Sequence, residues 1–173
     1  MKVLAFAASN SRNSINKALV QYAATLFDAD VEVIDLNDYE MPLYSVDREQ
    51  AGGIPAQAQQ FYDKIGQANA LLISFAEHNG NVTAAYKNLF DWTSRISQHV
   101  YQDKPAVLLA TSPGGGGAQS ALASAKGSAP HFAMDVKAAL SVPGFYDNFD
   151  LETGRIKNSD IQAKLETALA TLN

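Results

Sequence analysis

Ala70-Leu-Leu-Ile-Ser-Phe75 is a run in which only Ser74 is polar, and it predicts the fold class. A strand with one solvated face alternates apolar and polar residues, whereas a parallel strand covered on both faces is apolar almost throughout. Ala106-Val-Leu-Leu-Ala-Thr111 has the same character further along the chain. Two such runs indicate a parallel sheet with helices packed against both of its faces.

Other apolar runs alternate with stretches of helical spacing along the rest of the chain. We predict strands over residues 2–7, 31–36, 70–75, 105–111 and 138–143, and helices over 14–27, 54–68, 82–98, 117–127 and 158–172. Five βα units without a repeat or a linker predict a single domain over residues 1–173, with an α/β doubly wound parallel sheet. Five strands favour the flavodoxin-like strand order 2-1-3-4-5.

The composition limits the classes of partner and site. A net charge of −5 argues against nucleic acid, which calls for a basic patch. The chain has no cysteine, which excludes disulfides and thiolate metal sites and fits a cytoplasmic location. The three histidines show no ligand spacing, so we expect no metal. No apolar run approaches the roughly 18 residues of a membrane span, so we expect no membrane partner.

The loop over residues 8–16 is the first candidate ligand-binding segment. It holds three serines, three asparagines and one arginine between the first predicted strand and a helix. Hydroxyls and backbone N–H groups at a helix N-terminus form a common anion site. The spacing fits neither G-x-G-x-x-G nor the P-loop, so a phosphomonoester such as that of FMN suits it better. An ordinary βα loop with a serine N-cap is the alternative.

Two further loops belong to the same expected site, because ligands of such sheets bind beyond the carboxyl ends of the strands. Asn79-Gly80 predicts a tight turn whose backbone can face the edge of a flavin ring, although a plain turn is equally compatible with it. Four glycines, Gly114 to Gly117, favour close approach of backbone to a flat ligand over a flexible linker.

Three side chains near these loops each allow more than one interpretation. His78 either contacts a ligand edge or faces solvent. Glu77 either orients its loop or complements the dipole at the start of the helix predicted over 82–98. Trp92 lies on that helix at core-like spacing, so we expect it in the core rather than against a flavin.

Taken together, these motifs resemble those of the NADPH-dependent FMN reductase family, which includes chromate, quinone and azo-dye reductases. Residues 8–16 are similar to its first motif, approximately G-S-x-R-x-x-S-x-N. Residues 76–79 and 87–92 are similar to its second, approximately P-E-Y-N-x-S/G-x-P-x-x-L-K-N-x-I-D-W. Met41-Pro-Leu-Tyr44 resembles its L-P-x-Y turn, and residues 112–117 resemble its glycine-rich third loop, so the resemblance covers nearly the whole chain.

The resemblance implies a flavodoxin-like fold that holds FMN non-covalently, uses NADPH and forms a homodimer or homotetramer. The phosphate would lie in the first loop and the ring across the other two. The implied cofactor-binding residues are Ser9, Ser11, Arg12, Ser14, Ile15, Asn16, Glu77, His78, Asn79, Gly80, Ser112, Pro113, Gly114, Gly115 and Gly116. No catalytic residue is assigned, because the cofactor carries the chemistry.

The chain departs from the family pattern at four positions. Ala8 stands where the family has glycine, and Ser11 stands where it has arginine, with Arg12 one place later. Ala76 and His78 replace the usual proline and tyrosine. We expect FMN binding to survive these changes and the choice of electron acceptor to be altered by them.

The expected activity is transfer of hydride from NAD(P)H to FMN and then to a quinone, azo, chromate or free flavin acceptor in a ping-pong cycle. An FMN electron carrier of flavodoxin type is the alternative, although such carriers are typically more acidic than a charge of −5. A third reading is a phosphate-binding or interaction module that keeps the fold and has lost the cofactor.

Overall fold

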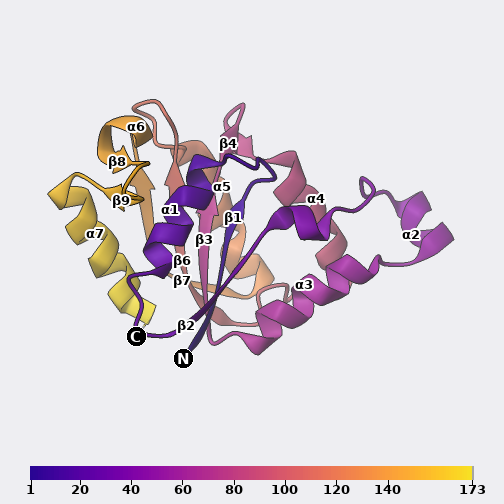
Figure 1. Cartoon of the computed structure of the whole chain (residues 1–173). Coiled ribbons are helices and arrows are strands. Elements are labelled where there is room, and N and C mark those ends of the chain that lie inside the picture. The colour runs from indigo at the N-terminus through magenta and orange to yellow at the C-terminus, as the bar shows by residue number, and fades with distance from the viewer. Residues whose placement is uncertain (173) are drawn as a thin grey trace.

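Five parallel strands form the central sheet of the computed structural model, which describes residues 1–172 (Figure 1). The strands are β1 (Lys2–Ala8), β2 (Asp30–Ile34), β3 (Ala70–Phe75), β6 (Lys104–Thr111) and β7 (Met134–Val142). They lie in the order β2-β1-β3-β6-β7, and every neighbouring pair is parallel. Counted along the chain this order is 2-1-3-4-5, so the predicted flavodoxin-like fold class is confirmed.

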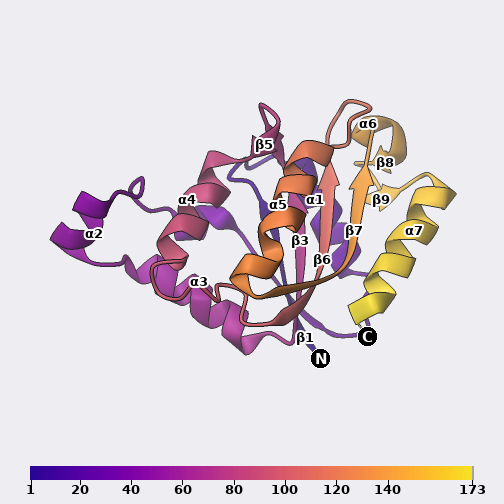
Figure 2. The same ribbon diagram turned by 180° about the vertical axis from the view of Figure 1, so that it is seen from behind.

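Helices cover both faces of the sheet, as Figures 1 and 2 show from opposite sides. One face packs against α1 (Ile15–Ala24) and α7 (Ser159–Leu169), and the other against α3 (Ala56–Gln67), α4 (Ala84–Thr93) and α5 (Gln119–Ser128). Strand β1 shows why this requires apolar residues throughout: Leu4 and Phe6 enter one core, whereas Val3 and Ala5 enter the other.

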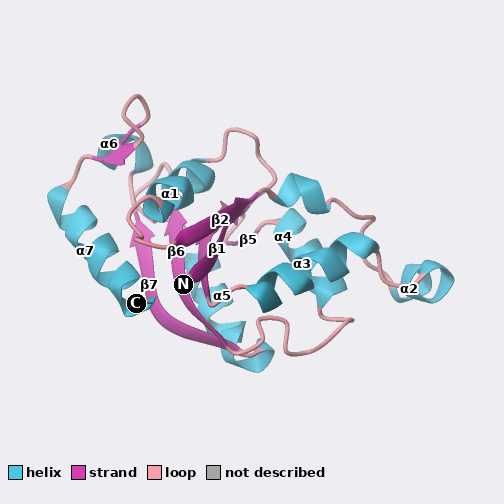
Figure 3. Ribbon diagram, turned by 60° about the horizontal axis from the view of Figure 1, so that its bottom comes forward, coloured by secondary structure: helices cyan, strands magenta, loops and turns pink. Residues whose placement is uncertain are grey.

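Several short elements were not predicted, because each is too short to show a periodic pattern. They are η1 (Leu36–Tyr39), α2 (Val46–Gly52), β4 (Glu77–His78), β5 (Asn81–Val82), η2 (Ala129–Phe132), α6 (Phe145–Asn148), β8 (Phe149–Asp150), β9 (Arg155–Ile156) and η3 (Ala170–Leu172). Helix α2 has no buried residue and extends away from the sheet at one end of the molecule (Figure 3).

Two predicted boundaries differ clearly from the structure. Helix α4 ends at Thr93 instead of residue 98, because the N–H groups of Arg95 and Ile96 donate to carbonyls three residues back and tighten the chain into turns. Strand β7, at the edge of the sheet, begins at Met134 instead of residue 138. Val136 packs against one core whereas Ala138 and Leu140 pack against the other, because the register with β6 shifts between Ala106 and Val107. Within residues 1–172, no helix is both long and apolar enough to cross a membrane.

Candidate functional site

The loops after β1, β3 and β6 meet beyond the carboxyl ends of the strands and enclose a pocket of about 250 Å³. The pocket therefore lies where the strand order reverses between β1 and β3, the usual ligand position in such sheets. Its lining consists of Ser9, Ser11, Asn13, Ser14, Ile15, Asn16, Ala76, Glu77, His78, Thr111, Ser112, Pro113 and Tyr146. Residues from all three predicted loops thus meet in one pocket, whereas the predicted residues Arg12, Asn79, Gly80 and Gly114–Gly116 do not line it.

In the first loop, the serines organise the start of helix α1. Ser14 is the N-cap, and its Oγ accepts a hydrogen bond of 3.3 Å from the backbone N–H of Lys17. The buried Ser9 accepts from the N–H of Ser11 at 3.2 Å, whereas the side chain of Ser11 is exposed. Arg12 is also exposed, but it does not line this pocket. A serine hydroxyl that accepts one bond keeps its own proton to donate, so a capped helix start remains compatible with an anion site.

Asn16 joins helix α1 to strands β3 and β6 at the floor of the pocket. Its side chain is 2% exposed. The Oδ1 atom accepts from the hydroxyl of Ser74 at 2.8 Å and from the N–H of Thr111 at 3.0 Å, while Nδ2 donates to the Thr111 carbonyl at 3.1 Å. Ser74 is in β3 and Thr111 ends β6. The amide of Asn16 is therefore engaged in the scaffold at the floor of the pocket.

The second loop is a β-hairpin with a two-residue turn. Strands β4 and β5 pair antiparallel, with Glu77 opposite Val82. Asn79 and Gly80 both have positive φ, +53° and +76°, as the tight turn of an Asn-Gly hairpin requires. The tight turn predicted at this position is confirmed. His78 lines the pocket with an exposed side chain, whereas Asn79 and Gly80 lie outside the lining.

Glu77 contacts a different helix from the one that the sequence suggested. Its Oε2 accepts a hydrogen bond of 2.9 Å from the backbone N–H of Ala121, in the first turn of α5. The helix expected over 82–98, α4, is capped instead by Thr83, whose hydroxyl accepts from the N–H of Tyr86. The carboxylate of Glu77 thus complements a helix dipole, but that of α5.

The third loop contains two kinds of glycine. A Cβ atom on Gly117, which has φ +58°, would lie 2.2 Å from Ser141 Oγ and 3.0 Å from the backbone nitrogen of Pro143. Gly114, Gly115 and Gly116 are exposed, and a Cβ atom on any of them would meet nothing within 4 Å. Of these four glycines, only Gly117 is therefore required by the packing. At the other three, the space that a side chain would occupy is empty.

Tyr146 is a pocket residue that the sequence analysis missed. It is 56% exposed and lies in α6, directly after β7. The N–H of Phe145 donates to the Ser112 carbonyl at 3.0 Å, which joins this segment to the third loop. No motif marks Tyr146, and the sequence offers only a tyrosine that follows the last strand of the central sheet.

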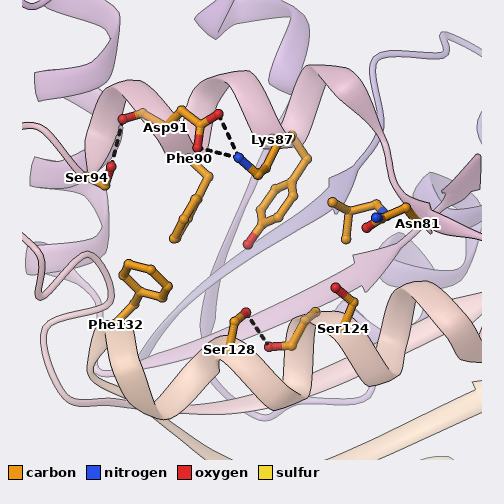
Figure 4. Close-up of a pocket in the computed structure, with 11 residues that line it drawn as sticks. Asn81, Lys87, Phe90, Asp91, Ser94, Ser124, Ser128 and Phe132 are labelled. Carbon is orange, nitrogen blue, oxygen red and sulfur yellow. Dashed lines mark hydrogen bonds and ion pairs between the residues drawn. The ribbon is translucent and has the colours of Figure 1, made fainter. Parts of the chain in front are cut away.

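A second pocket of about 400 Å³ lies between α4 and α5 (Figure 4). Phe90 and Phe132 pack edge to face in it, with ring centroids 4.6 Å apart, and Lys87 pairs with Asp91 on one side. Burial raises the pKa of the neighbouring Tyr86 to about 12, so its hydroxyl remains neutral. Trp92 is 1% exposed, and its predicted place in the core is confirmed. None of the predicted cofactor-binding residues lines this second pocket.

The family model described as NADPH-dependent FMN reductase matches residues 1–147. The chain belongs to this family. One of its relatives is the NADPH:quinone oxidoreductase of Arabidopsis thaliana. The two are 34% identical over 125 residues, which are 69% of this chain and 62% of that enzyme. The chain thus spans less than two thirds of the plant enzyme's length.

Two other proteins align with almost the whole of this chain. The 2-hydroxy-1,4-benzoquinone reductase of a Burkholderia species is 29% identical over 172 residues, which are 96% of this chain and 91% of that enzyme. The solved structure of FerB, a flavoenzyme NAD(P)H:(acceptor) oxidoreductase from Paracoccus denitrificans, aligns with a TM-score of 0.77 at 22% identity. That alignment covers 99% of this chain and 94% of FerB, and it supports the same fold.

Replacement of Asn16 by leucine tests its role in the scaffold. We expect Asn16→Leu to lower the free energy of unfolding by about 2–4 kcal/mol, because the buried Ser74 hydroxyl and Thr111 backbone lose their partner. Asn13→Ala, an exposed change in the same loop, is the control and should alter stability by less than about 0.5 kcal/mol. Urea unfolding of the three proteins measures the difference, and equal losses in both variants would contradict the assignment.

The two kinds of glycine in the third loop can be separated by alanine substitution. Gly117→Ala should cost about 2–4 kcal/mol of unfolding free energy, from the left-handed backbone and the overlap with Ser141 and Pro143. Gly115→Ala should be neutral or gain up to about 1 kcal/mol, because it only restricts the unfolded chain. Urea unfolding distinguishes them, and a loss at position 115 as large as that at 117 would refute the distinction.

Proposed function

We propose that the protein is an NAD(P)H-dependent FMN oxidoreductase that reduces quinones. The observation that carries this proposal is the single pocket formed by all three motif loops at the strand-order reversal of a chain belonging to the FMN reductase family. The quinone reductases from Arabidopsis and Burkholderia support the acceptor class. Azo compounds, chromate and free flavin are further acceptors to be tested.

The groups around the pocket fit FMN. Exposed Ser11 and the N-cap Ser14 present hydroxyls beside the N-terminus of α1, where a phosphate dianion is stabilised by N–H groups and the helix dipole. The tight hairpin turn and the glycines with open space around them leave room at the other two loops for a flat ring to approach the backbone. We infer that Ser11 and Ser14 would hold the phosphate, and that residues 77–80 and 112–116 would hold the ring.

FMN, when bound, supplies the capacity to accept hydride from NAD(P)H and to pass electrons to a second substrate. The residues of this chain bind and orient the cofactor and leave one side of the site open to the substrates. His78 and Tyr146 both line the pocket with exposed side chains, so they are placed to contact a nicotinamide or a quinone at its rim. No side chain is required to transfer a proton.

An anaerobic absorption titration tests this function. The purified protein should acquire bound flavin bands when FMN is added, lose them with NADPH or NADH, and recover them with a quinone. Steady-state rates at varied NADPH and quinone should give parallel double-reciprocal lines if the cycle is ping-pong. Retention of FMN without bleaching would indicate an electron carrier instead, and a failure to take up FMN would overturn the proposal.

The phosphate position can be tested with a charge reversal. Ser11→Asp should weaken FMN binding at least about tenfold, because a carboxylate would lie beside the phosphate, and should leave binding of riboflavin, which has no phosphate, within about twofold. Ser124→Asp, the same change at an exposed position in the second pocket, is the control. Quenching of flavin fluorescence measures both ligands, and equal weakening of FMN and riboflavin by Ser11→Asp would contradict the assignment.

A further inference from the structure

Helix α5 begins without a cap from its own sequence. Ala118 occupies the N-cap position with φ +58° and makes no side-chain hydrogen bond to the helix. The four residues before it are glycines, which have no side chain to offer. The first N–H groups of a helix have no partner inside the helix, so they require one from elsewhere. At α5 the local sequence provides only a backbone acceptor, the Gly116 carbonyl, for the N–H of Gln119.

Glu77 supplies the missing side-chain acceptor from another loop. It lies 44 residues earlier in the chain, and its Oε2 accepts from the N–H of Ala121 at 2.9 Å. Ala121 is the third residue of α5, the position that an N-cap side chain ordinarily satisfies. The charge is also favourable there, because the N-terminus of a helix carries a partial positive charge.

The hydrogen bond connects a residue that lines the pocket, Glu77, to a helix that lies beyond the lining, because the third loop contributes Ser112 and Pro113 to the pocket before it runs through the glycines into α5. Glu77 begins the β4–β5 hairpin, whereas α5 follows directly on the glycine-rich loop. The start of that loop is held by the N–H groups of Gly144 and Phe145, which donate to the carbonyls of Gly114 and Ser112, whereas Gly115 and Gly116, closer to α5, have no side chains to add a contact. A displacement of the start of α5 would therefore move the glycine backbone relative to the hairpin.

We propose that Glu77 is a positioning residue that fixes the glycine-rich loop against the β4–β5 hairpin, by capping α5 from the hairpin side. This inference rests on the proposed function, because Glu77 would set the spacing of the two loops that would hold the flavin ring. Glu77 acts through the backbone of α5 and needs no contact with a substrate.

Three variants separate the positioning role from a simple gain in helix stability. Glu77→Ala removes the acceptor. Glu77→Gln keeps an oxygen that can accept from Ala121 and removes the charge. Glu77→Ala combined with Gln119→Glu returns an acidic residue to the first turn of α5 without joining it to the hairpin. Ser120→Ala, an exposed change in the same turn, is the matched control.

The measurements are the thermal midpoint of the FMN-free protein, hydrogen exchange at the Ala121 amide, and the Kd for FMN. Glu77→Ala should lower the midpoint by about 2–4 °C, accelerate exchange at Ala121 and raise the Kd about tenfold. Glu77→Gln should keep the Kd within about threefold of the parent, and Ser120→Ala should leave all three unchanged. The double variant should recover most of the midpoint while its Kd stays raised.

Each contrary outcome identifies what has failed. If the parent protein binds FMN and Glu77→Ala binds it equally well, the residue only caps a helix and the positioning role is overturned. A double variant that regains both the midpoint and the Kd overturns that role in the same way. If the parent protein takes up no FMN, the proposed function and the positioning role both fall, whatever the midpoint of Glu77→Ala.

Discussion

The buried amide of Asn16 is the contact on which the arrangement of the site depends. It joins the first turn of α1 to the ends of β3 and β6 through three hydrogen bonds, so the end of the first loop is fixed to the points where the loops after β3 and β6 begin. A buried amide that satisfies several partners specifies a geometry more tightly than apolar packing does, because any displacement leaves polar groups unpaired. The pocket above Asn16 is thus a consequence of the scaffold beneath it.

A second layer of polar contacts lies closer to the surface and links the loops to one another. Glu77 joins the hairpin to α5, and the N–H groups of Gly144 and Phe145 donate to carbonyls at Gly114 and Ser112. These contacts hold backbone that has little apolar burial of its own. The loops can therefore keep exposed donors and acceptors for a ligand without losing their relative positions.

The sequence was sufficient to predict those features that depend on a local residue pattern or on the burial of a whole strand. Strand β3 is apolar throughout because both of its faces are covered, and Asn79-Gly80 adopts the turn that its residue types favour. The partner of Glu77 could not be predicted, since α5 comes next to it only through the order of the strands. Tyr146 was missed for the same reason, because nothing near it in the chain marks the pocket that it enters.

The glycines of the third loop show how the structure separates what the fold requires from what it does not. Gly117 is explained by its left-handed backbone and by the atoms of Ser141 and Pro143 against it. Gly114, Gly115 and Gly116 have no such neighbour, yet each glycine in place of alanine costs about 0.4–1 kcal/mol through the entropy of the unfolded chain. Packing within this chain gives no compensation for that cost. Close approach of a flat ligand to bare backbone would explain the glycines, and it is the use that the proposed flavin site would make of this loop.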